Sequence, residues 1–423
     1  MNYEFELKEY KRRISPQKIK QKSTPKKILR RVIVSLTILA VVFSLMLMQD
    51  VAIAIASTNQ NIIEELERNV NDSLNNIDFG ELDDILAGIG SGFNLFGEDS
   101  FMQRVSRIIS GEFQTEHNNM FSALFALFGS AIFGFLPIIM LIVGVAIFSG
   151  LMQALRHHNS GEGVRNIIHF VTYSAIVVIV MYGVASMIAT VTGTLNSIRT
   201  QMDIIFPILL TLMVASGGQA SSSVYQPAVV ILSNGVMQIF TLIVMPLFII
   251  TLIFSIVGNL SNTNRFDKFV SFFTSAYKWI LGLTFTIFLS FLAIQGITAS
   301  AHDGISIRAA RFTISSYVPF LGGYLSQGFD LVLASSILIK NAVGLAGLYL
   351  LLGVVLAPII QIAVFSLGLK LAAAITQPIA DERISNFLST VNKAFSMLAA
   401  ILIGVAFMYF LTIGLIIMTG NVL

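Results

Sequence analysis

The chain has 423 residues, of which 55% are hydrophobic and only 12% are charged. Because soluble domains carry about 25% charged residues, this composition indicates a protein that is buried in a membrane rather than dissolved in water. The absence of cysteine excludes disulfide bonds, thiol nucleophiles and cysteine-bound metals. The sequence has no phosphate-binding glycine loop, no HExxH zinc motif and no nucleophile elbow. We therefore expect neither an enzyme nor a cofactor, metal or nucleic-acid site.

Residues 1–56 are typical of a secretory signal. The first 31 residues hold 11 Lys and Arg against three Glu, and residues 32–48 are apolar and uncharged. Small residues follow at the spacing of a cleavage site, and we expect cleavage after Ala56. An uncleaved anchor helix is the alternative, because 17 apolar residues are close to the length that spans a bilayer. In either case the basic end stays in the cytoplasm and the following residues are exported.

Residues 57–120 form an acidic exported segment, with 12 Asp and Glu against three Arg. Apolar residues at spacings of three and four predict two amphipathic helices. The first includes Ile63, Leu66, Val70, Leu74 and Ile77, the second includes Phe101, Val105, Ile108 and Ile109, and Gly88, Gly90, Gly92 and Gly97 lie between them. The segment is either a solvated helical cap on the membrane domain, which we favour, or a docking surface for an exported partner.

Residues 121–423 form the membrane domain, in which long apolar runs exceed the ~20 residues that a helix needs to cross a bilayer. We predict six transmembrane helices, at residues 121–155, 165–193, 224–258, 268–299, 333–371 and 384–418. Two shorter apolar runs, 203–216 and 316–330, cannot span a bilayer alone and are predicted to be short re-entrant or interfacial helices. The fold class is therefore all-α, a polytopic helical membrane protein.

Charged residues between the helices predict the orientation in the membrane. One set of connections holds Arg156, Arg165, Arg265, Lys268, Lys370 and Arg383, and the other holds Arg199, Arg308 and Arg311 with Asp203 and Asp303. Because the first set is modestly the more basic, the positive-inside rule places it in the cytoplasm. The N-terminal signal independently places residue 120 outside. Residues 156–165, 259–267 and 372–385 are then cytoplasmic, and the C-terminus is exported.

Proline occurs within three long helices that run toward the cytoplasm, at Pro137, Pro246 and Pro358. Because proline removes a backbone donor and clashes with the preceding turn, we predict a kink at each position. Pro207 and Pro246 also match Pro319 and Pro358 at the same offset of 112 residues. This offset, together with the shared direction of the paired helices, suggests parallel internal repeats.

Lys340 is the strongest candidate for a functional residue in the membrane domain. Apolar residues precede it, Asn341 follows it, and Asp330 lies ten residues upstream near the start of the same helix. Ionisable residues within a membrane are costly and commonly mark functional sites. Asp330, Lys340 and Asn341 therefore form a candidate pore-lining or partner-contact site. The alternative, which we slightly prefer, is that Lys340 snorkels to the exported interface, since it lies about two turns into its helix.

Small residues are frequent on the later helices, including Gly344, Gly347, Gly353 and Gly368. Such residues let two helix backbones approach closely. Packing within one chain is the interpretation that we favour. Contacts between copies in a homo-oligomer are the alternative.

One segment carries a distinctive pattern, running Val318-Pro319-Phe320-Leu321-Gly322-Gly323-Tyr324-Leu325 and continuing to Ile339-Lys340-Asn341-Ala342-Val343-Gly344. This pattern resembles the signature region of the stage III sporulation protein AE family. The length, the signal-like start, the exported acidic segment and the polytopic remainder also match that family. The resemblance therefore covers nearly the whole chain.

The resemblance implies a multi-pass protein of the mother-cell membrane that surrounds the forespore in an endospore-forming bacterium. It also implies a non-enzymatic component of a channel or secretion-like complex that joins the two cells. Other membrane and intermembrane-space subunits of that complex would be its partners, and the family has no established catalytic residues to transfer. The alternative is a stand-alone secondary transporter with a midplane substrate site, which would need converging charges on broken helices.

Overall fold

A computed structural model of the chain describes residues 79–88, 99–111, 117–154, 162–260, 267–317, 322–378 and 382–419, together with residues 70, 72, 74 and 77. The chain divides into two compact units, residues 1–57 and 58–423. The first unit, with the signal and the expected cleavage site at Ala56, lies outside the described residues.

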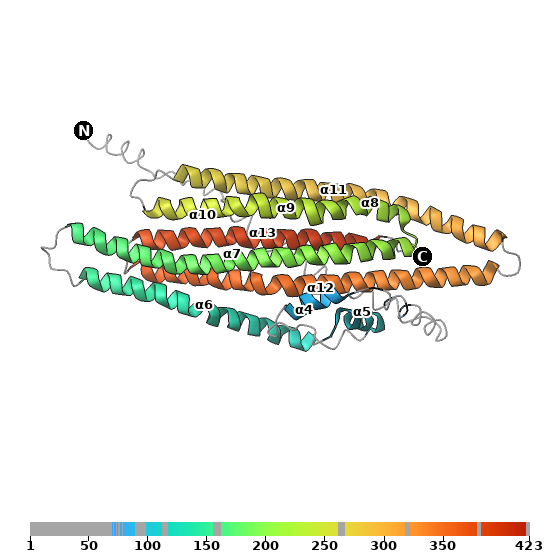
Figure 1. Cartoon of the computed structure of the whole chain (residues 1–423), viewed down its shortest axis with the longest axis horizontal. Coiled ribbons are helices and arrows are strands. Elements are labelled where there is room, and N and C mark those ends of the chain that lie inside the picture. Colours follow the sequence, from blue (N-terminus) through green and yellow to red (C-terminus); the bar gives the residue numbers. More distant parts are fainter. Residues whose placement is uncertain are drawn as a thin grey trace, which may run out of the picture. The chain divides into compact units, whose positions relative to one another are not determined.

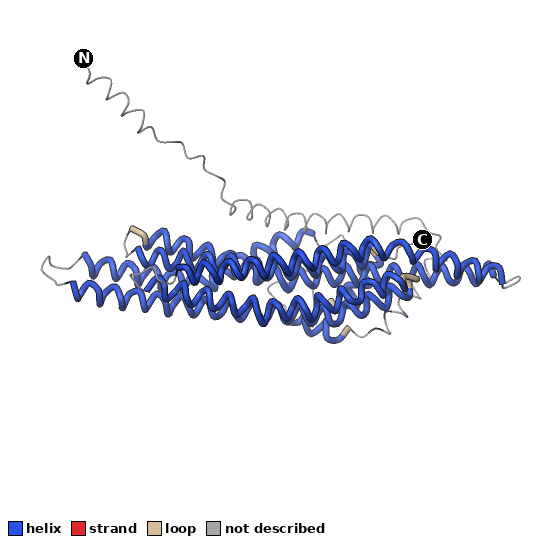
Figure 2. Tube along the Cα trace, turned by 90° about the horizontal axis from the view of Figure 1, so that it is seen from above, coloured by secondary structure: helices blue, strands red, loops and turns tan. Residues whose placement is uncertain are grey.

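The described secondary structure is helical throughout (Figure 1, Figure 2). Two short helices, α4 (Gly80–Gly88) and α5 (Phe101–Ser110), precede the bundle. The bundle consists of α6 (His117–Ala154), α7 (Glu162–Ala215), α8 (Gln219–Val230), η3 (Ile231–Val236), α9 (Met237–Ile239), η4 (Phe240–Val244), α10 (Met245–Leu260), α11 (Asp267–Tyr317), α12 (Gly322–Thr376) and α13 (Glu382–Met418). Within the part of the chain that the structure describes, six stretches are long and apolar enough to cross a membrane, which confirms the number predicted for residues 121–423.

The bundle has an inner end and an outer end, defined by the helices that meet there. At the inner end α6 meets α7, α10 meets α11, and α12 meets α13. At the outer end α7 turns into α8, α11 meets α12, and α13 terminates (Figure 1). The segment α8 to α10 acts as one continuous helix with two π-helical stretches, η3 and η4.

The two short runs predicted as separate helices are not separate, and this part of the prediction is wrong. Residues 203–215 are the outer end of α7, a single helix of 54 residues. Residues 316–330 are divided between the end of α11 and the start of α12. Pro207 does not break α7, because Phe206 and Leu209 beside it are fully buried and hold the helix in place. Length alone misled the prediction, since a helix can extend beyond the bilayer.

The same extension corrects the assignment of charged residues to outer connections. Arg199 and Asp203 lie within α7, and Arg308 and Arg311 lie within α11. They belong to the outer parts of long helices rather than to loops.

The helices α12 and α13 form the centre of the bundle. α12 packs against α13, α7, α6 and α11, and α13 packs also against α7 and α10. Figure 1 shows α6 along one edge and α11 along the other. Leu398, Leu402 and Val405 of α13 are completely buried. A helix that is apolar on all sides is expected in such a central position.

Glycine permits several close contacts between helices. A methyl group on Gly344 would overlap Ile417, one on Gly368 would overlap Ile139, and one on Gly404 would overlap Phe285. Gly347 likewise lies against Ile205. The interpretation of Gly344, Gly347 and Gly368 as packing residues within one chain is therefore confirmed.

The three prolines occupy different settings. Pro137 and Pro358 lie within α6 and α12, whereas Pro246 is the second residue of α10, directly after the π-helical η4. A π-helical turn is one way in which a helix accommodates an irregular backbone. The kinks at all three positions stay a prediction. Pro207 lies inside α7, whereas Pro319 lies outside the described residues, so the match of these two prolines and the internal repeats also stay a prediction.

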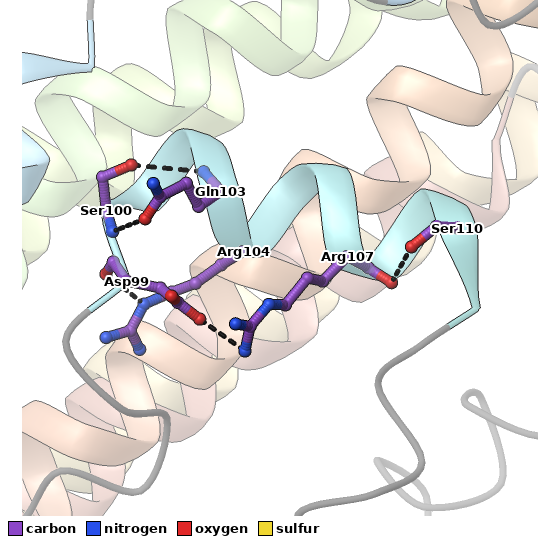
Figure 3. A network of polar contacts seen from close by, with 6 residues as sticks. All are labelled: Asp99, Ser100, Gln103, Arg104, Arg107 and Ser110. Carbon is purple, nitrogen blue, oxygen red and sulfur yellow. Dashed lines mark hydrogen bonds and ion pairs between the residues drawn. The ribbon is translucent and has the colours of Figure 1, made fainter.

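The second predicted exported helix is present as α5, with Phe101, Val105 and Ile108 buried. Figure 3 shows how its ends are fixed. The Ser100 hydroxyl accepts from the Gln103 backbone N–H at 3.3 Å, and the Gln103 side chain accepts from the Ser100 N–H at 3.0 Å. This reciprocal capping box satisfies two N–H groups that the helix itself leaves unpaired.

An ion pair and a C-terminal glycine also stabilise α5. Arg107 pairs with Asp99 at 2.6 Å, and Gly111 ends the helix with a φ of 74°. Its apolar face packs against α12, and α4 packs against α7. Gly88, one of the predicted breakers, is the last residue of α4. These contacts agree with the interpretation of this segment as a cap on the bundle.

Candidate functional site

Lys340 is completely buried in the outer part of α12. Its ammonium group donates a hydrogen bond to the backbone carbonyl of Thr419, the residue that follows α13. The last carbonyl groups of a helix lack partners within the helix, and the helix dipole places partial negative charge there. The cation of Lys340 therefore stabilises the end of α13 and does not extend to the lipid interface.

Thr419 also connects this point to α8. Its hydroxyl donates to the Leu415 carbonyl at 2.7 Å, so the Tyr225 hydroxyl, 3.1 Å away, is the donor in their contact. Tyr225 is completely buried. Side chains from α8, α12 and the end of α13 thus converge on one buried polar point at the outer end of the bundle.

The nearby turn between α7 and α8 depends on a glycine. Gly217 has a φ of 85°, a backbone conformation that side-chain-bearing residues rarely adopt. A Cβ atom at this position would lie 2.8 Å from Ile307 Cγ1 of α11. The turn is therefore packed tightly against α11, which keeps α8 and Tyr225 in position.

Asp330 does not join Lys340. Its carboxylate pairs with Arg311 of α11 at 2.7 Å, and both side chains are more than one third exposed. Ten residues of helix separate Asp330 from Lys340, about 15 Å along the axis. The structure therefore divides the candidate site into a buried lysine and a solvent-accessible ion pair nearer the helix start.

Asn341 belongs to a set of buried polar groups in the outer half of the bundle. Its side-chain oxygen has no hydrogen-bond partner among the described residues. The same holds for both amide atoms of Gln201, for the Gln295 oxygen and for the Tyr409 hydroxyl. Buried polar groups without partners are uncommon in folded proteins, and each costs free energy unless an ordered water or another molecule satisfies it.

Several of these residues were not found from the sequence. Thr419 and Tyr225 are single polar residues near helix ends, and neither carries a recognisable pattern. Gln201 and Tyr409 are isolated polar residues in apolar helices. A polar group within an apolar helix is the one sequence feature that could have identified them as candidate site residues. Arg311 was noted only as a charge outside the helices.

The bundle defines the chain as a polytopic helical membrane protein, with membrane-length helices packed around α12 and α13. The sequence model of a family described as stage III sporulation protein AE matches residues 100–420, and the chain belongs to this family. The stage III sporulation protein AE of Bacillus subtilis (strain 168) is 28% identical over 277 residues, which cover 66% of this chain and 69% of that protein. No solved structure matches the chain.

Proposed function

We propose that this protein is a non-enzymatic membrane component of a channel or secretion-like complex that joins the mother cell and the forespore during endospore formation. Its location would be the mother-cell membrane around the forespore, and its partners would be other membrane and intermembrane-space subunits. Family membership supports the link to sporulation. The resemblance of the segment from Val318 to Gly344 to the family signature supports the role in a complex.

The observation that carries the proposal is the length of the apolar helices. The stretches Phe170–Ala215 and Leu325–Thr376 contain 46 and 52 residues. At 1.5 Å per residue they are about 70 Å and 80 Å long, more than twice the ~30 Å of the bilayer core. A continuous bundle that extends beyond the membrane suits a component of an assembly that crosses the space between two membranes.

A stand-alone secondary transporter fits these contacts less well. Such a protein binds its substrate near the bilayer midplane, between broken helices that carry polar or charged groups. Among the described side chains of α6 to α13, Lys340 is the only charged one that is buried. It lies at the outer end of the bundle and is engaged with the terminus of α13.

The proposal includes an orientation in which the inner end of the bundle faces the cytoplasm. The outer end, with α5 and the C-terminus, would then face the intermembrane space. The basic residues between the predicted helices motivate this orientation. A reporter that is active only outside the cytoplasm, fused after Leu423, should be active, and an inactive reporter would reverse the orientation.

The proposed function is tested by purifying the tagged protein from membranes of sporulating cells in a mild detergent and counting the subunits that accompany it. We expect other membrane and exported subunits in fixed ratio. A protein that purifies alone from such cells, at a level that supports sporulation, would contradict the proposal.

The variant Lys340→Gln sharpens this experiment, with the exposed Lys278→Gln as its control. Membrane protein level, subunit recovery and spore yield are scored separately. We expect a near-normal level with loss of subunits and spores for Lys340→Gln, and no change for Lys278→Gln. Normal spore yield would mean that the role of Lys340 is only to cap the end of α13.

If Lys340→Gln lowers the protein level, Asn341→Ala gives the same test, because it removes an amide whose oxygen has no partner among the described residues.

A further inference from the structure

The exposed face of α7 changes character near residue 185. Toward the inner end it presents large apolar side chains, with Ile167, Phe170, Val171, Val178 and Tyr182 exposed. From residue 185 to residue 211 the exposed positions are small or polar, namely Ala185, Ser186, Ala189, Gly193, Asn196, Thr200, Asp203, Pro207 and Thr211, and Val214 is exposed beyond them. One helix therefore presents two kinds of surface along its length.

The neighbouring segment from α8 to α10 changes in the same way. Leu242, Ile243, Ile249, Ile253 and Val257 are exposed on its inner part. Its outer part exposes the polar residues Gln219, Ser223, Gln226, Asn234 and Gln238, together with two large apolar ones, Val230 and Ile231. Arg199 joins the two helices, since its guanidinium group donates to the Asn234 side-chain oxygen at 3.1 Å and lies 3.8 Å from Asp203. We call Asn196, Arg199, Asp203, Asn234 and Gln238 the polar face.

Helix α11 shows that the polar face begins at a height where other helices expose apolar side chains. The rings of Phe240 and Phe285 are 6.4 Å apart, which places these two residues at the same height. Gln238 and Ile287 each lie two residues outward from this contact. Ile287 is 59% exposed, and Ile294, seven residues further out, is 66% exposed.

Helix α6 gives the same result on the other edge of the bundle. The Phe365 ring touches the ring of Phe135 at 4.7 Å and occupies the space that a side chain at Gly183 would need. Phe125 and Gly193 each lie ten residues outward from this point, about 15 Å along their helices. Phe125 is 78% exposed, whereas Gly193 is exposed with open space around it.

A bilayer surrounds all helices at a given height, so these neighbours cannot all face lipid. The Thr200 hydroxyl bonds to its own helix at the Asn196 carbonyl, and a hydroxyl of this kind is tolerated in lipid. The amide side chains of Asn196, Asn234 and Gln238, and the charges of Arg199 and Asp203, are costly there. Gln238 is exposed at the height of Ile287, and Asn234, which Arg199 contacts, is exposed between the heights of Ile287 and Ile294. This indicates a polar environment on one side of the bundle.

We propose that the polar face lines an aqueous path through the outer part of the membrane domain, a proposal that rests on the channel function above. The ligand is water together with small hydrophilic solutes. Arg199 and Asp203 neutralise each other, so the face carries no net charge from this pair and does not select strongly for anions or cations. The face is open on one side, and other subunits of the complex close the path.

Cysteine substitution tests this proposal directly, because the natural chain has no cysteine to react. Two pairs are matched in height: Gln238→Cys with Ile287→Cys, and Gly193→Cys with Phe125→Cys. Open membrane fragments from sporulating cells are treated with a charged, membrane-impermeant thiol reagent. Since the thiolate is the reactive form and needs water, we expect Gln238→Cys and Gly193→Cys to react at least about tenfold faster than their partners.

Two other results would overturn the proposal. If all four cysteines react, the whole outer half lies in bulk water and no path within the membrane is needed. If none reacts, the polar face is covered by protein. Asn196→Cys and Ile294→Cys replace any variant that fails to reach the normal membrane level. The subunit count in the purified complex does not depend on cysteine labelling. Labelling therefore tests the aqueous path, and the subunit count separately tests membership of a channel complex.

Discussion

The inner half of the bundle exposes large apolar side chains on α6, α7, α10 and α11, whereas the outer half exposes polar groups on α7 to α9 and also buries polar atoms that have no hydrogen-bond partner among the described residues. Gln201, Tyr409 and Asn341 all belong to the outer half, as do Lys340 and Tyr225. The difference shows that helix length and apolar content do not locate the bilayer along these helices. The bilayer is located instead by the identity of the exposed residues at each height.

We expect the two halves also to differ in what stabilises them. In lipid the hydrophobic effect contributes little to helix association, and close van der Waals packing becomes important. In contact with water, burial of apolar surface stabilises the bundle. Close glycine contacts occur in both halves, at Gly368 toward the inner end and at Gly344 toward the outer end. Three predictions test how far the halves differ, beginning with the largest expected effect.

Gly404→Ala should destabilise the bundle where the two halves meet. Because the added methyl carbon would lie far closer to a Phe285 ring carbon than van der Waals contact allows, overpacking should cost about 3 kcal/mol or more, of which improved helix propensity offsets about 1 kcal/mol. Gly414→Ala in the same helix is the control, because nothing lies within 4 Å of its added methyl group. Thermal unfolding in detergent should show a lower Tm for Gly404→Ala alone. Equal Tm values would mean that α11 and α13 separate without cost.

Gln201→Leu should stabilise the isolated protein. Gln201 is completely buried, and neither of its amide atoms has a hydrogen-bond partner among the described residues. Replacing such a group by an apolar one of similar size should raise the free energy of unfolding by about 1–3 kcal/mol. The exposed Gln238→Leu is the control, with an expected change within about 0.5 kcal/mol. A fall in stability for Gln201→Leu would instead show that water or another subunit satisfies the amide.

Asp330→Asn should have the smallest effect. The pair with Arg311 is partly exposed, and exposed ion pairs contribute about 0.2–1 kcal/mol. The difference from the natural protein should shrink further at high salt, because salt screens exposed charges. Arg311→Gln should give a similar change, and the double variant should add little more. Loss of spore formation at a normal protein level would instead assign Asp330 a role in partner contact or conduction.

Much of the fold could be predicted because it depends on local patterns. Long apolar runs predict membrane helices whatever they pack against, and six were found. The spacing of Phe101, Val105 and Ile108 likewise predicted the buried face of α5. Ser100 and Gln103 carried a further signal, since Ser followed three residues later by Gln is typical of a capping box.

The candidate site could be predicted only in part. Lys340 was recognised because a charge in an apolar helix is unusual, but its partner Thr419 lies 79 residues away in the sequence. Whether a lysine near a helix end snorkels or becomes buried depends on which helix ends beside it. The pairing of Asp330 with Arg311 depends in the same way on the packing of α11 against α12.

The sequence by itself determined the class of protein, the number of membrane helices and the identity of the unusual charge, because each follows from the free energy of transfer between water and lipid. Only the tertiary structure decided that α7 continues past Pro207, that Lys340 stabilises the end of α13, and that Gly193 and Gln238 lie at heights where α6 and α11 present apolar side chains. These features depend on how the helices align along one another. That alignment is set by contacts such as Gly183 with Phe365 and Gly404 with Phe285, which join residues far apart in the chain.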